Sequence, residues 1–188
     1  MRIGILGGTF NPIHKGHLKL AEGARRRLKL DKVIFVPANI PPHKKSSCIL
    51  SAKERFRMVQ LAIKAKLYFD ISDYEIREGG TSYSVKTLGA FRRKFGKAAE
   101  IFFLTGSDSL SQLNTWKDID RIAELANLVI VSRPGYKLDK ALGLETVIIP
   151  TPDISSSIIR QRIKKGMDVK KFLPIQVYSY IEEKGFYK

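Results

Sequence analysis

MRIGILGGTFNPIHKGH, residues 1–17, is a short apolar strand that runs through a glycine pair into the start of a helix. Residues 2–6 are apolar at nearly every position, which is typical of a parallel strand covered by helices on both faces. Gly7 and Gly8 let backbone N–H groups approach a bulky ligand, Thr9 offers a hydroxyl, and the helix start supplies a positive dipole end. The stretch therefore predicts an anion site at the carboxyl edge of a parallel sheet, where open α/β folds bind ligands.

The glycine loop belongs to neither of the two commonest phosphate-binding patterns. A Walker loop needs a Gly-Lys-Ser/Thr ending, and a dinucleotide fold needs G-x-G-x-x-G spacing; residues 7–17 have neither. A kinase or dehydrogenase function therefore loses support.

His14 and His17 are spaced three residues apart at the predicted helix start, so both imidazoles can face one bound phosphate. There they would donate N–H bonds to charge that develops during group transfer. A zinc pair is disfavoured because no Glu or Cys lies nearby to complete a tetrahedral site. An isolated histidine here would be read as a cap or turn residue, but the adjacent Gly-Gly-Thr-Phe favours phosphate contact.

The rest of the chain alternates short β-branched or aromatic runs with helix-period segments, the signature of βαβ units. Strands are predicted over residues 2–6, 32–36, 69–74, 100–104, 128–131 and 146–149. Helices are predicted over residues 17–28, 51–66, 83–95 and 118–125, from Ser155 or Ser156 to before Gly166, and from Pro174 to Gly185. We expect a doubly wound α/β fold with a Rossmann-like parallel sheet and helices on both faces, formed as one domain over residues 1–188.

Composition sets limits on the class of protein. The chain has 44% apolar residues and one cysteine, Cys48, which excludes internal disulfides. No leader segment and no apolar run of roughly 18 residues is visible, so we expect a soluble cytoplasmic protein without membrane contact. The net charge of +16 suits nucleic acid, an anionic membrane or a polyanionic small substrate. Because no aromatic residues interleave with the basic groups, solvated faces are favoured over a nucleic-acid footprint.

A second polar motif, ISSSIIR, occupies residues 154–160. Ser155 and Ser156 at a helix start can present hydroxyl and backbone donors to phosphate, and Arg160, about one turn further, adds a delocalised charge. Alone, this motif would be read as a serine-capped helix with a surface arginine. Its pairing with the first motif favours phosphate binding.

Together the two motifs resemble the G-G-T-F-D-P-x-H-x-G-H and I-S-S-T-x-I-R signatures of the nucleotidylyltransferase superfamily. Asn11 replaces the commoner Asp and Ser157 the commoner Thr, and both keep a short polar side chain. The resemblance to bacterial nicotinate mononucleotide adenylyltransferases extends over nearly the whole chain. It is carried by residues 41–44 (PPHK), 81–83 (TSY), 106–110 (GSDSL), Trp116, 133–135 (RPG) and 173–174 (LP). Phosphopantetheine adenylyltransferases share the end motifs but lack the PPHK loop, and cytidylyltransferases usually differ in the second motif.

This resemblance implies that the 5′-phosphate of a pyridine mononucleotide attacks the α-phosphorus of ATP in line, with pyrophosphate leaving and Mg²⁺ held mainly by the ATP phosphates. His17 would stabilise the α-phosphate, and His14 and Arg160 would act with it as catalytic residues. The implied ATP-binding residues are Gly7, Gly8, Thr9, Phe10, His14, His17, Gly106, Asp108, Arg133, Ser155, Ser156 and Arg160.

The mononucleotide side is implied in the same way. Trp116 would stack on the pyridine ring, although a lone tryptophan is more often a core residue. The hydroxyl of Ser84 and the backbone amide of Lys117 would hold the nicotinate carboxylate, and Asn39, His43 and Lys44 would contact the rest of the mononucleotide. Lys44 also has an alternative interpretation as a solvated loop base. A pocket with only N–H and O–H donors would leave an amide nitrogen unpaired, at about 1–3 kcal/mol, and so would prefer the acid.

ATP and nicotinate mononucleotide are thus the expected partners, and no nucleic acid is expected. Two alternatives stay open within the same chemistry, nicotinamide mononucleotide and phosphopantetheine as acceptors. A third, from another class, is a basic nucleic-acid-binding protein on the same fold, which would show salt-dependent oligonucleotide binding and no ATP turnover. The sequence leaves the oligomeric state open, a homo-oligomer included.

Overall fold

The computed structural model describes residues 1–42, 49–106, 116–132, 145–150 and 154–188. Six strands form one sheet in the order β3-β2-β1-β4-β5-β6, and each neighbouring pair is parallel. The strands are β1 (Arg2–Gly8), β2 (Lys32–Pro37), β3 (Phe69–Ile71), β4 (Glu100–Gly106), β5 (Asn127–Ser132) and β6 (Glu145–Ile148). The strand order reverses direction between β1 and β4, which places the ligand crevice of this fold class at their carboxyl ends.

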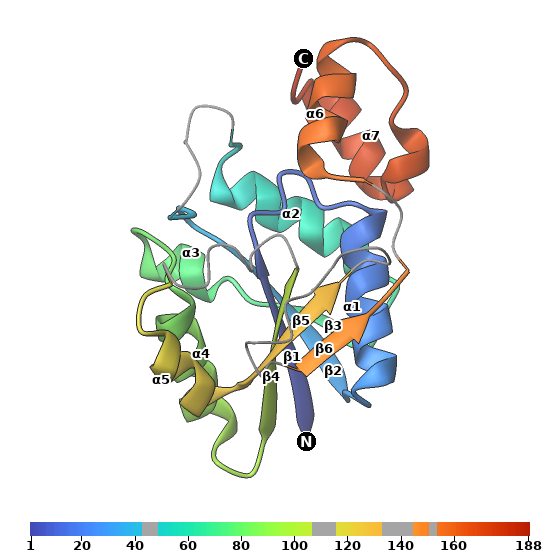
Figure 1. The fold of residues 1–188 in the computed structure, drawn as a ribbon. Coiled ribbons are helices and arrows are strands. Elements are labelled where there is room, and N and C mark those ends of the chain that lie inside the picture. Colours follow the sequence, from blue (N-terminus) through green and yellow to red (C-terminus); the bar gives the residue numbers. More distant parts are fainter. Residues whose placement is uncertain (43–48, 107–115, 133–144, 151–153) are drawn as a thin grey trace.

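Helices cover both faces of the sheet (Figure 1). They are α1 (Lys15–Arg27), α2 (Ala52–Ile63), α3 (Tyr74–Glu78), α4 (Ser84–Phe95), α5 (Ile119–Leu125), α6 (Ser156–Lys164), the 3₁₀ helix η4 (Lys170–Phe172) and α7 (Ile175–Lys184). α1 and α2 lie on one side and α4 and α5 on the other, while α6 and α7 lie beyond the carboxyl end of the strands, with α7 against α2. This architecture confirms the doubly wound α/β fold.

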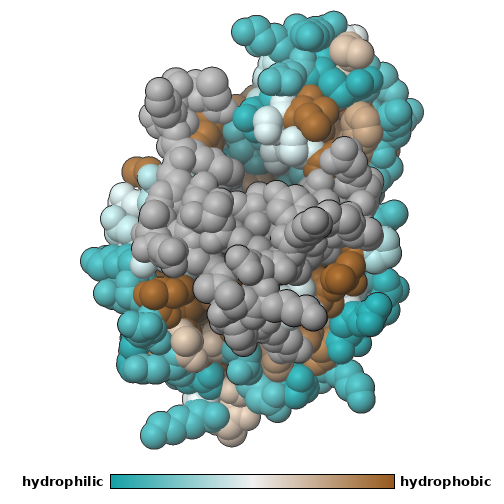
Figure 2. Space-filling view, viewed as in Figure 1, coloured by the Kyte–Doolittle hydropathy of each residue, from teal (hydrophilic) through white to brown (hydrophobic). Residues whose placement is uncertain are grey.

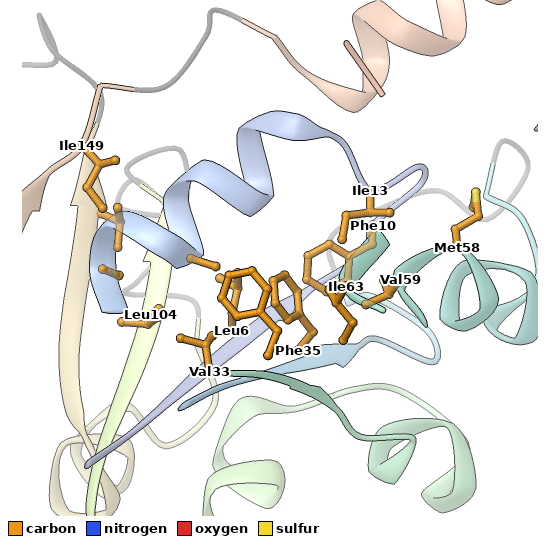
Figure 3. Close-up of a cluster of buried hydrophobic side chains, with 14 of the residues drawn as sticks. Leu6, Phe10, Ile13, Val33, Phe35, Met58, Val59, Ile63, Leu104 and Ile149 are labelled. Carbon is orange, nitrogen blue, oxygen red and sulfur yellow. The ribbon is translucent and has the colours of Figure 1, made fainter. Parts of the chain in front are cut away.

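Two buried clusters divide along the pleat of the sheet, because successive strand residues point to opposite faces. Leu6 and Phe35 belong to the cluster shared with α1, α2, α6 and α7, whereas Ile5 and Ile34 belong to the cluster under α4 and α5. Figure 3 shows Phe10, which comes from the loop after β1, inserted among the side chains of the first cluster. The loop is therefore anchored in the core and does not lie loosely over it.

The predicted C-terminal boundary of the third strand is wrong. The strand stops at Ile71, and Tyr74, predicted as its last residue, begins α3. Local hydrogen bonds explain the change: the Ser72 hydroxyl accepts from the Tyr74 N–H at 3.2 Å, and the Asp73 carboxylate accepts from Arg77 Nε at 2.9 Å. Short polar side chains that bond nearby backbone favour helix starts over strands.

The predicted helix caps are present. The Ser51 hydroxyl accepts from the Glu54 N–H at 3.2 Å, Ser155 caps α6, and Gly185 ends α7 with a φ of 63°. The Glu54 carboxylate accepts a bond from the Tyr180 hydroxyl of α7 at 2.5 Å, and this bond raises the pKa of Tyr180 to about 12. The Glu54 side chain thus ties α2 to α7.

Hydrophilic residues cover most of the coloured surface in Figure 2, and hydrophobic residues form separate small groups there. In the part of the chain that the structure describes, no helix is long and apolar enough to cross a membrane.

Candidate active site

The loop between β1 and α1 is held from inside the protein. Phe10 has a φ of 47° and is 2% exposed, with its ring centroid 5.8 Å from that of Phe35 and 5.2 Å from that of His17. Gly8 leaves room for this ring, because a Cβ at Gly8 would lie 2.9 Å from it. A Cβ at Gly7 would make only ordinary contact with Phe103, at 3.6 Å, so packing alone does not require this glycine.

The two histidines lie together at the start of α1, with ring centroids 3.8 Å apart and an interplanar angle of 28°. His14 is the N-cap and is buried, while His17 is half-buried. The backbone N–H of His14 donates to Nδ1 of His17 at 3.2 Å. A nitrogen that accepts this bond carries no proton, so the proton of His17 is on Nε2, on the far side of the ring. His17 therefore presents a single N–H donor away from its own helix.

The second motif lies directly against this loop. The Ser156 hydroxyl donates to the Pro12 carbonyl at 2.9 Å, and Nη1 of Arg160 donates to the Asn11 carbonyl at 2.9 Å. Ser155 caps α6 by accepting from the Ile158 N–H at 3.2 Å. The structure thus brings together the two motifs that the sequence paired, and the positive N-terminal ends of α1 and α6 share one edge of the loop.

Asn11 is buried at 3% exposure, and its Oδ1 accepts from the Tyr187 hydroxyl at 2.8 Å and the Leu50 N–H at 3.2 Å. Burial raises the pKa of Tyr187, and the guanidinium groups of Arg160 and Arg55 partly offset this. A neutral amide oxygen suits these two neutral donors, which explains how Asn serves where Asp is commoner. The last turn of the chain is thereby tied to the loop.

Beside the loop is a cavity of about 190 Å³ at the carboxyl ends of the central strands. Its described lining is Gly7, Gly8, Thr9, Ala38, Pro41, Pro42, Glu75, Ser82, Tyr83, Ser84, Phe103, Thr105, Trp116, Lys117 and Ile122. Trp116 is half-buried and packs on Phe103 with ring centroids 5.6 Å apart, and the Lys117 ammonium lies 5.2 Å from the centre of the Tyr83 ring. Aromatic walls and a few polar groups make a pocket for a flat ring with a polar substituent.

Other predicted site residues fall around this cavity or outside the described ranges. Gly106 is the last residue of β4. Asn39 follows β2; its backbone N–H donates to the Ser82 hydroxyl at 2.8 Å and its side-chain amide to the Gly80 carbonyl at 2.9 Å. Predicted residues outside the described ranges are His43, Lys44, Asp108 and Arg133.

Two charged residues near the cavity were missed by the sequence analysis. Arg55 of α2 is 1% exposed and donates to the Thr9 carbonyl at 2.8 Å. Its signal was available, because it shares a helical stripe with the buried Met58 and Val59, and a charge on such a stripe is unusual. Glu75 lines the cavity and lies in α3, a helix that was not predicted and whose first residue, Tyr74, was assigned to a strand. Burial raises the pKa of the Glu75 carboxyl, and bonds from Thr87 and Ser82 partly offset this.

Comparisons with known proteins agree with this geometry. A model of the cytidylyltransferase-like family matches residues 5–162. The probable nicotinate-nucleotide adenylyltransferase of Clostridium tetani is 42% identical over 98% of both chains, and that of Thermus thermophilus is 43% identical over 100% of both. A solved structure of Plasmodium falciparum nicotinic acid mononucleotide adenylyltransferase complexed with NaAD has the same fold, with a TM-score of 0.81 at 19% identity over 99% of this chain and 97% of that one.

These relatives confirm the family that the two motifs indicated, and with it the class of nucleotidyltransferase enzymes. The chain belongs to the cytidylyltransferase-like family and, within it, to the nicotinate-nucleotide adenylyltransferases.

Proposed function

We propose that this chain transfers the AMP moiety of ATP to nicotinate mononucleotide, forming nicotinate adenine dinucleotide and pyrophosphate. The observation that carries the proposal is the junction of the two motifs, through Ser156 and Arg160, at a loop that borders an aromatic cavity. Hydrogen-bond donors that suit phosphate lie beside a pocket that suits a ring, and this combination suits a reaction that joins two nucleotides. Curated relatives named for this activity, at 42% and 43% identity, support it.

In the proposed reaction, an oxygen of the mononucleotide 5′-phosphate forms a bond to the α-phosphorus of ATP as the bond to pyrophosphate breaks. Charge accumulates on the α-phosphate oxygens, and the Nε2–H of His17 is the donor assigned to them, with Arg160 and the N-terminal ends of α1 and α6 adding positive potential. No covalent enzyme intermediate is needed, because positioning and charge neutralisation supply most of the catalysis of phosphoryl transfer.

Mg²⁺ is the proposed metal, carried by the ATP phosphates. The described donors at the loop are imidazole, hydroxyl, guanidinium and backbone N–H groups, which suit phosphate oxygens better than a cation. No group of three or more His, Cys, Asp or Glu that could hold a metal occurs among the described residues. Bound Mg²⁺ would neutralise phosphate charge and favour departure of pyrophosphate.

For the acceptor, Trp116 is assigned to the pyridine ring, and the Ser84 hydroxyl and the Lys117 N–H to the nicotinate carboxylate; all three residues line the cavity. The Lys117 ammonium beside the Tyr83 ring adds a positive charge at the same wall, which favours an acid over an amide. Asn39, His43 and Lys44 are proposed contacts for the rest of the mononucleotide, and Asp108 and Arg133 for ATP.

The test is pyrophosphate release from ATP and Mg²⁺ with nicotinate mononucleotide, nicotinamide mononucleotide or phosphopantetheine as acceptor. We expect the nicotinate compound to be preferred at least about tenfold over its amide. His17→Ala should lower kcat by about 100- to 1000-fold. His17→Asn is the matched control for the helix cap, because its Oδ1 can still accept the His14 N–H bond while the Nε2 donor is gone, and it should be equally slow. Preference for another acceptor would overturn the pocket assignment, and a fully active His17→Asn would overturn the role of Nε2.

A further inference from the structure

Arg55 is 1% exposed, and its guanidinium contacts three different segments of backbone. Nε donates to the Leu50 carbonyl at 2.9 Å, Nη1 to the Thr9 carbonyl at 2.8 Å, and Nη2 to the Asn39 carbonyl at 2.8 Å. Thr9 lies on the loop between β1 and α1, here called the phosphate loop. Asn39 lies just after β2, on what is here called the mononucleotide segment because Asn39 is assigned to the mononucleotide. One buried group therefore spans the two halves of the proposed active site.

Hydrogen bonds continue from Arg55 to the wall of the cavity. The Asn39 N–H donates to the Ser82 hydroxyl at 2.8 Å, and the Ser82 hydroxyl in turn hydrogen-bonds the Glu75 carboxyl. The Thr87 hydroxyl donates to Oε1 of Glu75 at 2.6 Å. Ser82 lines the cavity, so hydrogen bonds through Asn39 and Arg55 link the cavity lining to the loop between β1 and α1.

Stability alone does not account for a guanidinium at this position. Burial lowers the pKa of Arg55, and the nearby Tyr187 and Glu75 groups offset this only in part. A well-packed apolar side chain often stabilises a core as well as, or better than, a buried charge. What an apolar side chain cannot do is fix three carbonyls at set distances, which the planar fork of arginine does.

Resting on the proposed function, we propose that Arg55 is a positioning residue: it holds the phosphate loop and the mononucleotide segment in register, so that the attacking phosphate lies in line with the α-phosphorus of ATP. It touches neither substrate. Its effect is on the distance between two bound substrates, to which group transfer is very sensitive; a misplacement of about 1 Å can cost roughly 100-fold in rate.

The chain offers a matched control in Arg92 of α4, which also fixes backbone carbonyls. Its Nη2 donates to the Leu125 carbonyl at 2.7 Å and its Nη1 to the Ala99 carbonyl at 2.6 Å. None of these residues lines the cavity. Lysine in either position keeps the positive charge and loses the fork. Arg55→Lys and Arg92→Lys should both lower the melting temperature, but only Arg55→Lys should change catalysis.

The experiment measures kcat and both KM values below the melting temperature of each variant, and the affinity for ATP or nicotinate mononucleotide alone by calorimetry. For Arg55→Lys we expect kcat to fall about 100-fold, with each separate affinity within about threefold of wild type. Arg92→Lys should keep kcat within about twofold. If Arg55→Lys does not fold, Ser82→Ala, which removes the next hydrogen bond in the series, should be measured instead. It should lower kcat about tenfold and leave each separate affinity within about threefold of wild type.

Three results would overturn the role. A kcat within about threefold of wild type in the folded variant would do so, and so would an equal loss in Arg92→Lys, since both point to stability alone. A loss confined to one separate substrate affinity would make Arg55 part of that binding site. Wild-type protein that releases no pyrophosphate would instead overturn the proposed function, and this role with it.

Discussion

Gly7 and Gly8 end β1, and changing each to alanine should affect different properties of the protein, substrate binding for Gly7 and stability for Gly8. At Gly7 the new methyl group would meet Phe103 at 3.6 and 3.9 Å, which is ordinary contact, and the position is exposed on the cavity side. The folded protein therefore has room for it. Because alanine restricts the unfolded chain more than glycine does, Gly7→Ala should change the free energy of unfolding by about zero to +1 kcal/mol.

At Gly8 the methyl group would lie 2.9 Å from the Phe10 ring. Phe10 is 2% exposed and packs on both Phe35 and His17, so it has no space into which to move. Overpacking of this kind costs about 1–3 kcal/mol. Gly8→Ala should therefore unfold at lower temperature, and its kcat should also fall because the displaced Phe10 ring would shift His17.

Substrate binding should distinguish the two variants in the opposite way from stability, because here Gly7→Ala should be the impaired one. The methyl group of Gly7→Ala would hold a phosphate away from the backbone N–H groups of the loop, and one lost bond to a charged group is worth about 1.5–3 kcal/mol. That predicts a KM raised about 10- to 150-fold, at a melting temperature equal to or above that of the wild type. Thermal denaturation and initial-rate assays on both variants test this. If Gly7→Ala is as unstable as Gly8→Ala, or binds substrates as wild type does, the argument that Gly7 is reserved for a ligand is wrong.

Two further predictions concern buried groups around the loop. Tyr187→Phe removes the bond to Oδ1 of Asn11 and should lower the free energy of unfolding by about 1 kcal/mol, measured by urea denaturation; no change would mean that the tail does not hold the loop in solution. Burial raises the pKa of Glu75 above 4.5, so the folded state binds its proton more tightly than the unfolded state does. The part of the wild-type stability that the Glu75 proton contributes should then be lost as pH rises from about 4.5 through the raised pKa, and Glu75→Gln, which does not titrate, should not show this loss. Parallel pH profiles of the two proteins would contradict the assignment.

The sequence predicted the parts of the fold that depend on local pattern. Short runs with β-branched or aromatic residues placed all six strands, and the helices predicted to start at Ser51 and at Ser155 or Ser156 begin within a few residues of those positions. The error at Tyr74 has the same origin, since this aromatic residue extended the predicted strand past the point where Ser72 and Asp73 begin a helix. The Ser72 hydroxyl accepts from the backbone N–H two residues further on, and this bond outweighs the residue pattern there.

At the site, the residues that a pattern could find were those expected to touch a ligand. The glycines, the paired histidines and the serine-arginine motif each form a short pattern whose residue types suit a phosphate, so these patterns could be found in the sequence. Arg55 has only one partner nearby in the sequence, Leu50; Thr9 and Asn39 come to its guanidinium only when α2 packs beside β2. The local sequence shows only a charge on an apolar stripe, which indicates that Arg55 has polar partners but does not identify them.

The two motifs could be paired in the sequence, but their direct contact depends on the fold and was not predicted. Ser156 and Arg160 were predicted to bind phosphate, yet each also donates to a carbonyl of the first loop, at Pro12 and Asn11. A donor that contacted both the loop and a phosphate would tie the position of the phosphate to the position of the loop. Arg55 also bonds that loop, through the Thr9 carbonyl, so two guanidinium groups hold the loop at different residues. Loss of either one should therefore displace the loop even where every group that contacts a phosphate is kept.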